Sequence, residues 1–139
     1  MKIDELQNGI VFDHVKSGNG MKIYELLRLG NFDGQIALIQ NAKSSKMGKK
    51  DVLKISCKNF DFDLDAVAFI DDALTVNIIK DGELVEKKQL SLPDKITNVV
   101  KCKNPRCITS TEQEINHVFK LTDKDNGVYR CIYCETQAK

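Results

Sequence analysis

The chain has 139 residues, of which 42% are hydrophobic and 29% charged, and its 21 basic and 20 acidic side chains leave a net charge of +1. This composition is typical of a folded globular protein with one domain or two small ones. No apolar run approaches the roughly 20 residues of a membrane span, and the beginning, MKIDELQNGI, lacks the apolar segment of a signal peptide. We therefore expect a cytoplasmic protein without a membrane partner, and the balanced charge disfavours a dedicated nucleic-acid binder.

Apolar residues before Pro93 follow strand and helix periodicities in turn. Stretches rich in β-branched residues predict strands, and apolar residues spaced three and four apart predict helices. Asp81-Gly82 stands between two alternating runs, which is the pattern of a tight β-hairpin turn. In chain order we expect a strand at 9–15, a helix at 20–30, strands at 35–42 and 49–57, a helix at 63–73 capped by Asp63, and a hairpin at 74–90.

The order strand-helix-strand-strand-helix-strand-strand predicts a ferredoxin-like α/β sheet with an additional edge strand. Pro93, in the segment SLPDK, follows the last of these strands and disfavours its continuation. We therefore expect an N-terminal α/β domain at 1–93 and a second, small domain at 94–139, which makes the fold class α+β.

Four of the five cysteines lie in the second part, as the pairs Cys102-x4-Cys107 and Cys131-x2-Cys134, with 23 residues between the pairs. Two such short chelate loops supply the tetrahedral ligand set of a structural Zn2+ site. A domain of 46 residues also needs a crosslink of this kind, because a core so small rarely folds alone. We expect one structural zinc ion in an all-β, zinc-ribbon-like domain, with no open position on the metal for catalysis.

Other uses of the paired cysteines fit less well. A reducing compartment disfavours disulfides, and a redox pair needs a single Cys-x-x-Cys at the start of a helix. A nucleic-acid-binding ribbon needs a basic surplus, but this part has 8 basic and 6 acidic side chains, and four thiolates around Zn2+ add a net charge of −2. A ribbon that docks a protein partner fits better. His117 is interpreted as a surface or sheet residue and Cys57 as a small core residue.

Lys50, Val52 and Lys54 fall on one face of the strand expected at 49–57, because alternate residues of a strand point the same way. Neighbouring segments add Asp13, His14, Thr75, Asn77, Ile79, Lys87 and Lys88. Two interpretations stay open: a solvated sheet face that carries lysines, or an anion or nucleotide site. No P-loop or G-x-G-x-x-G motif supports the second, and no arrangement of nucleophile, base or paired carboxylates supports an enzyme.

Six segments of the chain together form a specific pattern: GIVFDH, MGKKDVLKI, TVNII, SLPDKITNV and the cysteine-containing segments CKNPRCI and YRCIYCE. Each segment is weak evidence alone, but their order and spacing together are highly specific. By these segments the chain resembles, over almost its whole length, the regulatory chain of aspartate carbamoyltransferase.

The resemblance implies a non-catalytic subunit that acts in pyrimidine biosynthesis. Its N-terminal domain would bind nucleotide effectors, CTP as inhibitor and ATP as activator, and its zinc domain would dock on the catalytic chains. Two regulatory chains would pair as a homodimer through their N-terminal sheets, and three dimers would join two catalytic trimers. The alternative function is a zinc-ribbon nucleic-acid-binding factor. The family's effector-binding positions fall on Leu6, Asp13, His14, Lys50, Val52, Lys54, Asn77, Ile79 and Lys87.

Overall fold

The structure is a computed structural model that describes residues 7–58 and 62–138. The chain divides into two compact units, Met1–Ser91 and Leu92–Lys139. The first unit is built on a five-stranded sheet with the strand order β2-β3-β1-β4-β5, in which every neighbouring pair is antiparallel. Its elements are β1 (Gly9–Lys16), α1 (Asn19–Leu26), the 3-10 turn η1 (Leu29–Asn31), β2 (Ile36–Ser44), β3 (Gly48–Ser56), α2 (Leu64–Ile70), β4 (Thr75–Lys80) and β5 (Glu83–Gln89).

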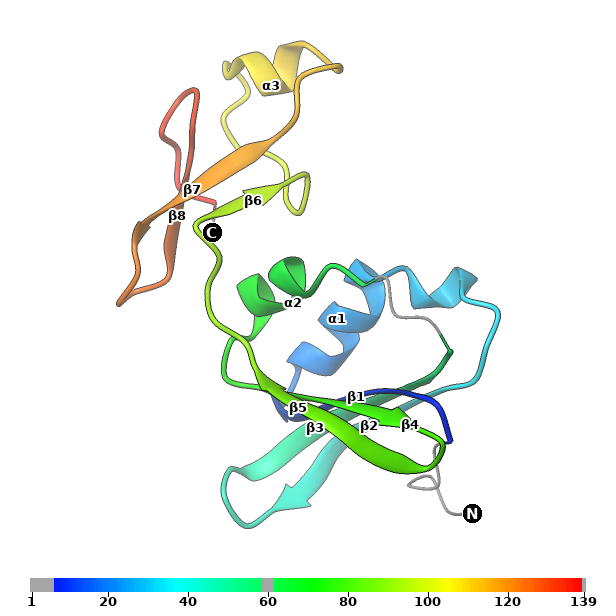
Figure 1. Ribbon diagram of the computed structural model, residues 1–139. Coiled ribbons are helices and arrows are strands. Elements are labelled where there is room, and N and C mark those ends of the chain that lie inside the picture. The colour runs from blue at the N-terminus through cyan, green and yellow to red at the C-terminus, as the bar shows by residue number, and fades with distance from the viewer. Residues whose placement is uncertain (1–6, 59–61, 139) are drawn as a thin grey trace. The chain divides into compact units, whose positions relative to one another are not determined.

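Helices α1 and α2 lie on one face of this sheet, and within the described residues no helix covers the opposite face (Figure 1). This is the ferredoxin-like arrangement with an additional edge strand, β5, that the sequence predicts. The core fills the space between helices and sheet, because alternate residues of the central strands and one side of each helix are apolar. Its fully buried side chains include Phe12, Val15, Ile23, Leu53, Val67 and Val76.

Both helices are shorter than predicted. α1 ends at Leu26 because Arg28 has a left-handed backbone, with φ of 54°, and the chain then continues as η1. α2 starts after Asp63, whose carboxylate caps it as predicted by accepting a first-turn N–H at 3.2 Å, and it ends at Ile70 because Asp71 is extended. None of the helices in the described part of the chain is long and apolar enough to cross a membrane.

The turn between β4 and β5 confirms the predicted hairpin. Asp81 and Gly82 have φ of 52° and 79°, and two positive values in succession are what a two-residue type I′ turn requires. The residues before β1 bind this turn: the Gln7 carbonyl accepts the Gly82 N–H at 2.8 Å, and the Asn8 side chain accepts the Asp81 N–H at 3.3 Å. The tip of the hairpin is therefore held to the beginning of β1.

Strand β3 lies between two strands that each contain a β-bulge. On β1, Asp13–His14 lie opposite the single residue Val52, and on β2, Gln40–Asn41 lie opposite Asp51. The second residue of each bulge has a left-handed backbone, with φ of 56° on β1 and 59° on β2. Because a bulge adds one residue and bends its strand, both neighbours of β3 change direction beside Asp51 and Val52.

The carboxylate of Asp51 is fully buried and connects β3 to two other elements. Its Oδ2 accepts the N–H groups of Gly18 and Gly20 at the start of α1, each at 3.0 Å. Its Oδ1 accepts the N–H of Asn41 in the bulge of β2, also at 3.0 Å. Three backbone donors compensate the burial of the charge, so Asp51 fixes α1 and β2 on β3.

The second unit is a three-stranded antiparallel sheet in the order β6-β7-β8, with a single helical turn, α3, outside it. Ile96, Phe119 and Tyr129 are buried and form its small core. The Tyr129 hydroxyl donates to the Pro93 carbonyl at 2.6 Å, which ties the first residues of the unit to its last strand. Apart from α3 this is the predicted all-β architecture. The elements are β6 (Lys95–Thr97), α3 (Ile108–Thr111), β7 (Val118–Asp123) and β8 (Val128–Cys131).

Candidate functional site

The helix-free face of the first unit's sheet contains a hollow of about 390 Å³, here called the open-face pocket. Its volume falls within the roughly 300–1,000 Å³ of small-molecule sites. All five strands contribute side chains that point away from the core. The lining residues are Val11, Asp13, Ile39, Lys50, Val52, Lys54, Asn77, Ile79 and Leu84.

Strand register places part of this lining in one row across the sheet. Val11 pairs with Lys54 on one side and with Asn77 on the other, and Asn77 pairs with Lys87. Directly paired residues project to the same face of a sheet. The row therefore carries a cation at each end with an apolar and an amide side chain between them, which suits a ligand with anionic groups and a flat, uncharged part.

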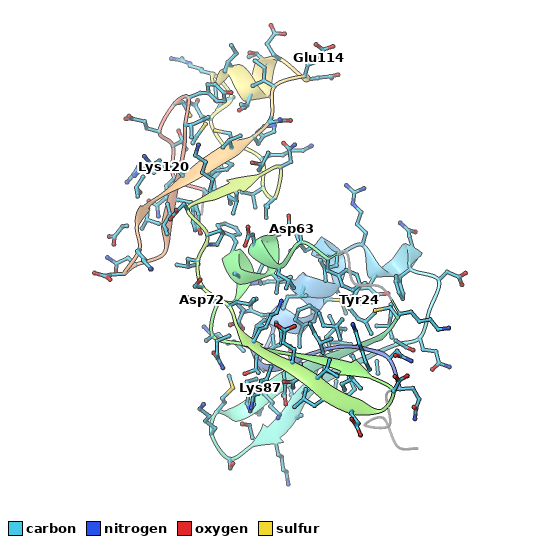
Figure 2. The ribbon with its side chains drawn as sticks, viewed as in Figure 1. Tyr24, Asp63, Asp72, Lys87, Glu114 and Lys120 are labelled. Atoms are coloured by element: carbon cyan, nitrogen blue, oxygen red, sulfur yellow. The ribbon has the colours of Figure 1, made fainter. Side chains whose placement is uncertain are left out.

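Of the nine effector residues predicted from the sequence, six line the pocket. Lys87 is outside the lining but lies next to it, opposite Asn77 on β5, and Figure 2 shows it over the sheet, away from Tyr24 on α1 and Asp63 at the start of α2. His14 is half-buried and does not line the pocket. Leu6 is outside the described residues. The six lining residues are Asp13, Lys50, Val52, Lys54, Asn77 and Ile79.

The bulge in β1 explains why Asp13 and His14 are placed differently. A bulge re-aims side chains relative to a regular strand. Asp13 lines the pocket, and its Oδ1 lies 2.9 Å from Nζ of Lys50 on β3. His14, the residue with the left-handed backbone, donates its N–H to the same carboxylate at 2.6 Å. His14 thus orients Asp13 through its backbone, whereas its imidazole lies outside the lining.

Asp13 and Lys50 form a half-buried ion pair, with side-chain exposures of 24% and 21%. Burial opposes ionisation of Asp13, but hydrogen bonds from the Lys50 ammonium and the His14 N–H, together with the charge of Lys50, outweigh it and hold the pKa of the carboxyl below its ordinary value. Within the described residues, Lys54 has no carboxylate at salt-bridge distance. Lys54 is therefore the pocket cation whose charge is least compensated.

One buried polar atom of the pocket has no hydrogen-bond partner among the described residues. It is Oδ1 of Asn77, the amide in the middle of the row. Leaving such an acceptor unpaired costs about 1–3 kcal/mol, so a ligand that donates a hydrogen bond there would recover part of this cost.

The sequence prediction missed three apolar lining residues: Val11, Ile39 and Leu84. Val11 alternates with the core residues Ile10 and Phe12, and this alternation is a signal that could have placed it on the open face. Ile39 precedes the bulge of β2 and Leu84 follows the hairpin turn, so their directions depend on features that the pattern of the sequence does not show.

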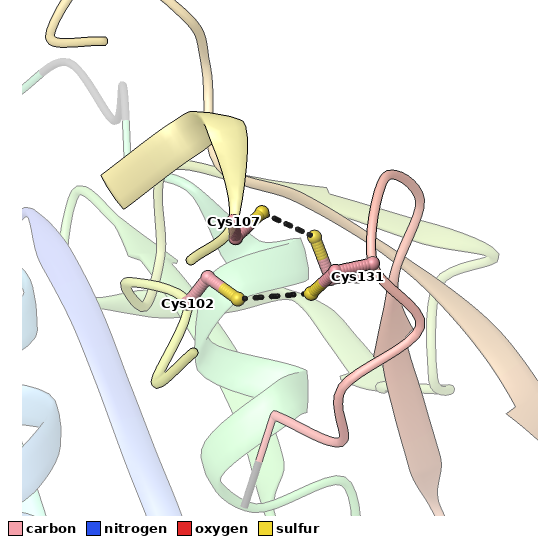
Figure 3. A group of neighbouring side chains, drawn as sticks. Cys102, Cys107 and Cys131 are labelled. Carbon is pink, nitrogen blue, oxygen red and sulfur yellow. Dashed lines mark hydrogen bonds between the residues drawn. The ribbon is translucent and has the colours of Figure 1, made fainter. Parts of the chain in front are cut away.

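The second unit brings the four paired cysteines together. Their sulfur atoms all lie within 4.8 Å of one another, with 3.5 Å between Cys102 and Cys134 and 3.7 Å between Cys107 and Cys131. Figure 3 shows the segment of Cys102 and Cys107 facing the segment of Cys131 across these contacts. Four sulfurs at about 2.3 Å from one ion are about 3.8 Å apart in a tetrahedron. The arrangement therefore fits a tetrahedral metal ion.

Threonine hydroxyls lie beside two of the four thiols. Thr109 donates to Sγ of Cys107 at 3.1 Å and lowers the pKa of that thiol, and the Thr136 hydroxyl, 3.2 Å from Sγ of Cys134, lowers that pKa to about 6. Burial instead raises the pKa of Cys102 to about 12 and also raises that of Cys131. Each pair thus contains one thiol that its surroundings stabilise as a thiolate, the form that binds metal.

His117, interpreted from the sequence as a surface or sheet residue, contacts this cluster. It is half-buried just before β7, and its Nδ1 accepts the backbone N–H of Cys102 at 3.0 Å. No sequence signal indicated this contact, because the two residues are 15 positions apart. Cys57 is partly buried against the core of the first unit, where burial raises its thiol pKa.

Large apolar side chains are exposed next to three of the four cysteines. Ile108 follows Cys107 and is 46% exposed, and Ile132 and Tyr133, between Cys131 and Cys134, are 44% and 50% exposed. The loops that carry the paired cysteines therefore also expose apolar side chains, which mark an interaction site where they form a contiguous patch.

Comparison with known proteins matches both units. Residues 1–91 match the family described as "Aspartate carbamoyltransferase regulatory chain, allosteric domain", and residues 94–139 match "Aspartate carbamoyltransferase regulatory chain, metal binding domain". Among curated proteins, the aspartate carbamoyltransferase regulatory chain of Clostridium tetani is 49% identical over 97% of this chain and 94% of the relative. Its counterpart from Clostridium acetobutylicum is 47% identical over 97% of this chain and 92% of the relative. The counterpart from Bifidobacterium longum is 41% identical over 100% of this chain and 99% of the relative.

Proposed function

Because the chain belongs to the aspartate carbamoyltransferase regulatory chain family and is a non-catalytic subunit, we propose that its two domains have separate roles. Residues 1–93 bind the nucleotide effectors CTP and ATP. Residues 94–139 hold a structural zinc ion and dock on the catalytic chains. The observation that carries this proposal is the open-face pocket, in which Lys50 and Lys54 lie beside apolar side chains such as Val52. The effector signal would regulate pyrimidine biosynthesis.

In the proposed effector complex, Lys54 and Lys87 bind phosphate or ribose oxygens from the two ends of their row. Val52 and Ile79 cover the base, and Asp13 lies toward the ribose. Two charges about 4 Å apart attract each other by about 1–4 kcal/mol at a protein surface. Several such contacts are enough for micromolar to millimolar binding of a nucleoside triphosphate.

Calorimetric titration of the full-length chain with CTP and with ATP tests the pocket. Replacing Lys54 by Ala should weaken binding by about tenfold, because the least compensated cation of the pocket is lost. Lys49→Ala is the matched control, since Lys49 lies on the same strand but points to the other face of the sheet. Absence of binding to the intact chain at millimolar nucleotide would refute the effector proposal.

Zinc is proposed because four cysteine sulfurs in a closed, tetrahedral arrangement match its preferred structural site. The ion would supply folding free energy to the second unit and would leave no position for substrate. Elemental analysis should find one zinc per chain, and a chelator or a mercurial reagent should unfold the second unit. Four freely reactive thiols and no metal in the intact protein would contradict this assignment.

The proposed partner of the second unit is the catalytic chain of aspartate carbamoyltransferase. Support comes from the family and from the exposed Ile108, Ile132 and Tyr133 on the metal-binding loops. Tyr133→Ala should weaken capture of the catalytic chain, and Met21→Ala, which truncates an exposed apolar side chain in the first unit, is the control. Pull-down with a tagged chain that recovers no catalytic chain would contradict the assignment.

Two further expectations concern assembly and location. A homodimer through the N-terminal sheets is supported by β2 and β5, which are the outer strands of the sheet within the described residues and whose edges could pair with a second copy. Sedimentation of the isolated chain at micromolar concentration should show a dimer, and a monomer would argue against it.

The protein is expected to act in the cytoplasm, where pyrimidine nucleotides are made, and fractionation of cells checks this. The alternative, a nucleic-acid-binding zinc ribbon, is not favoured by the family match.

A further inference from the structure

We infer that His117 is a positioning residue of the metal site, which fixes the backbone of the metal ligand Cys102. This inference rests on the metal site proposed above. Nδ1 of His117 accepts the Cys102 N–H at 3.0 Å. The candidate ligand set already consists of four sulfur atoms, so the imidazole acts through Cys102 and not by binding the ion.

The imidazole of His117 can orient Cys102 because its own backbone is held on both sides by Asn98. The Asn98 N–H donates to the His117 carbonyl at 2.7 Å, and the His117 N–H donates to the Asn98 side-chain oxygen at 2.9 Å. Asn98 has a left-handed backbone, with φ of 58°, and its amide also donates to the Asn116 side chain at 3.0 Å. These contacts extend the β6–β7 pairing by one position and keep His117 in register.

Cys102 needs such support more than Cys107 and Cys131 do. Cys107 is the N-cap residue of α3, and Cys131 is the last residue of β8, so regular structure orients both. Cys102 lies in an irregular segment between β6 and α3, where its N–H is bound by the His117 ring. Fixing this N–H fixes the direction in which Cys102 presents its sulfur to the ion.

The expected effect is on metal retention. Residues that orient metal ligands typically contribute 10- to 100-fold to metal affinity. Without the His117 acceptor, Cys102 would leave the ion more readily, and a competing chelator would gain access at that position. Local detachment of one ligand accelerates metal release without unfolding of the whole unit.

Two substitutions separate the hydrogen bond from the bulk of the side chain. His117→Leu removes the acceptor and retains an apolar side chain of similar size, whereas His117→Asn places an amide oxygen where Nδ1 stands. In the zinc-loaded, full-length chain, transfer of zinc to an excess of 4-(2-pyridylazo)resorcinol should be about 10- to 100-fold faster for His117→Leu than for wild type. For His117→Asn it should stay within about threefold of wild type. Equal rates for wild type and His117→Leu would overturn the inference.

The dependence of the zinc-release rate on chelator concentration distinguishes local opening at Cys102 from a general loss of stability. Release through local opening at Cys102 should accelerate with chelator concentration, whereas release limited by unfolding is independent of it. Val118→Ala, at the neighbouring residue on β7, is the control for ordinary destabilisation. Its zinc-release rate should depend on chelator concentration in the same way as that of wild type. Chelator-independent release from His117→Leu would assign His117 a merely structural role and overturn the inference. Wild-type protein without bound metal would overturn the metal site itself, and the inference with it.

Discussion

Replacing Asp51 by Ala should selectively destabilise the first unit. The carboxylate is fully buried and accepts three backbone N–H groups, from Gly18, Gly20 and Asn41, each at 3.0 Å. In the variant, the buried N–H of Gly20 loses its partner at a cost of about 1–3 kcal/mol, and the two partly buried donors lose about 0.5–1.5 kcal/mol each when water replaces the carboxylate. Taken at the middle of these ranges, the expected loss is about 4 kcal/mol.

This loss is large compared with the stability of a unit of this size, which is about 5–14 kcal/mol at 0.05–0.15 kcal/mol per residue. Hydrogen exchange followed by mass spectrometry on the full-length chain reports each unit separately. Since about 1.4 kcal/mol corresponds to a factor of ten, protection of the β1–β3 peptides should fall by about 100- to 1,000-fold or more. Protection of the second unit should be unchanged.

Two further variants make this experiment decisive. Asp51→Asn keeps one acceptor oxygen, so its loss should be intermediate, at about 2–3 kcal/mol. Asp33→Ala removes an exposed carboxylate from the same unit and should change stability by less than about 0.5 kcal/mol. Protection in Asp51→Ala within about 1 kcal/mol of wild type would show that the three donors find other partners, and the assigned role of Asp51 would be wrong.

Three other perturbations have defined outcomes. Gly82→Val should lower the free energy of unfolding of the first unit by about 1–2 kcal/mol in chemical denaturation, because a β-branched side chain is strained at φ of 79°. An unchanged denaturation midpoint would argue against the type I′ turn. Tyr129→Phe should lower the stability of the zinc-loaded second unit by about 1 kcal/mol through loss of the bond to Pro93, measured by thermal unfolding, and an equal melting temperature would count against that bond. Hydrogen bonding and charge from Lys50 outweigh burial and lower the folded-state pKa of Asp13, so ionised Asp13 should stabilise the first unit above about pH 4, the ordinary pKa of an aspartate. This stability difference from Asp13→Asn should be lost as the pH falls through the folded-state pKa, followed by chemical denaturation at each pH. A constant difference down to about pH 2 would contradict the ion pair.

Much of the fold and part of the site follow from local sequence patterns. The period-two alternation of β3 places Lys50, Val52 and Lys54 on one face, as the structure shows them in the pocket lining. Asp81-Gly82 predicts the hairpin because few dipeptides adopt two positive φ values at low cost. The close spacing within each cysteine pair likewise anticipates the sulfur cluster.

The features that the sequence does not reveal depend on backbone irregularities and on distant partners. His14 has φ of 56° and Asn41 has φ of 59°, and neither bulge has a glycine or another pattern that marks it. His14 was therefore expected in the pocket, where the structure places only Asp13 of that pair. Asp51 looks like one more polar residue in a charged stretch, and its burial is explained by donors up to 33 residues away.

Strand β3 serves two layers of the first unit at once, which has a consequence for how this gene can vary. Asp51, Leu53 and Ile55 face the helices, and Lys50 and Lys54 face the pocket. Inserting or deleting one codon inside the strand would exchange these two sets, burying lysines and exposing the core, because side chains alternate with a period of two. We therefore expect members of this family to differ in β3 by substitution alone, and to confine changes in length to the turns on either side.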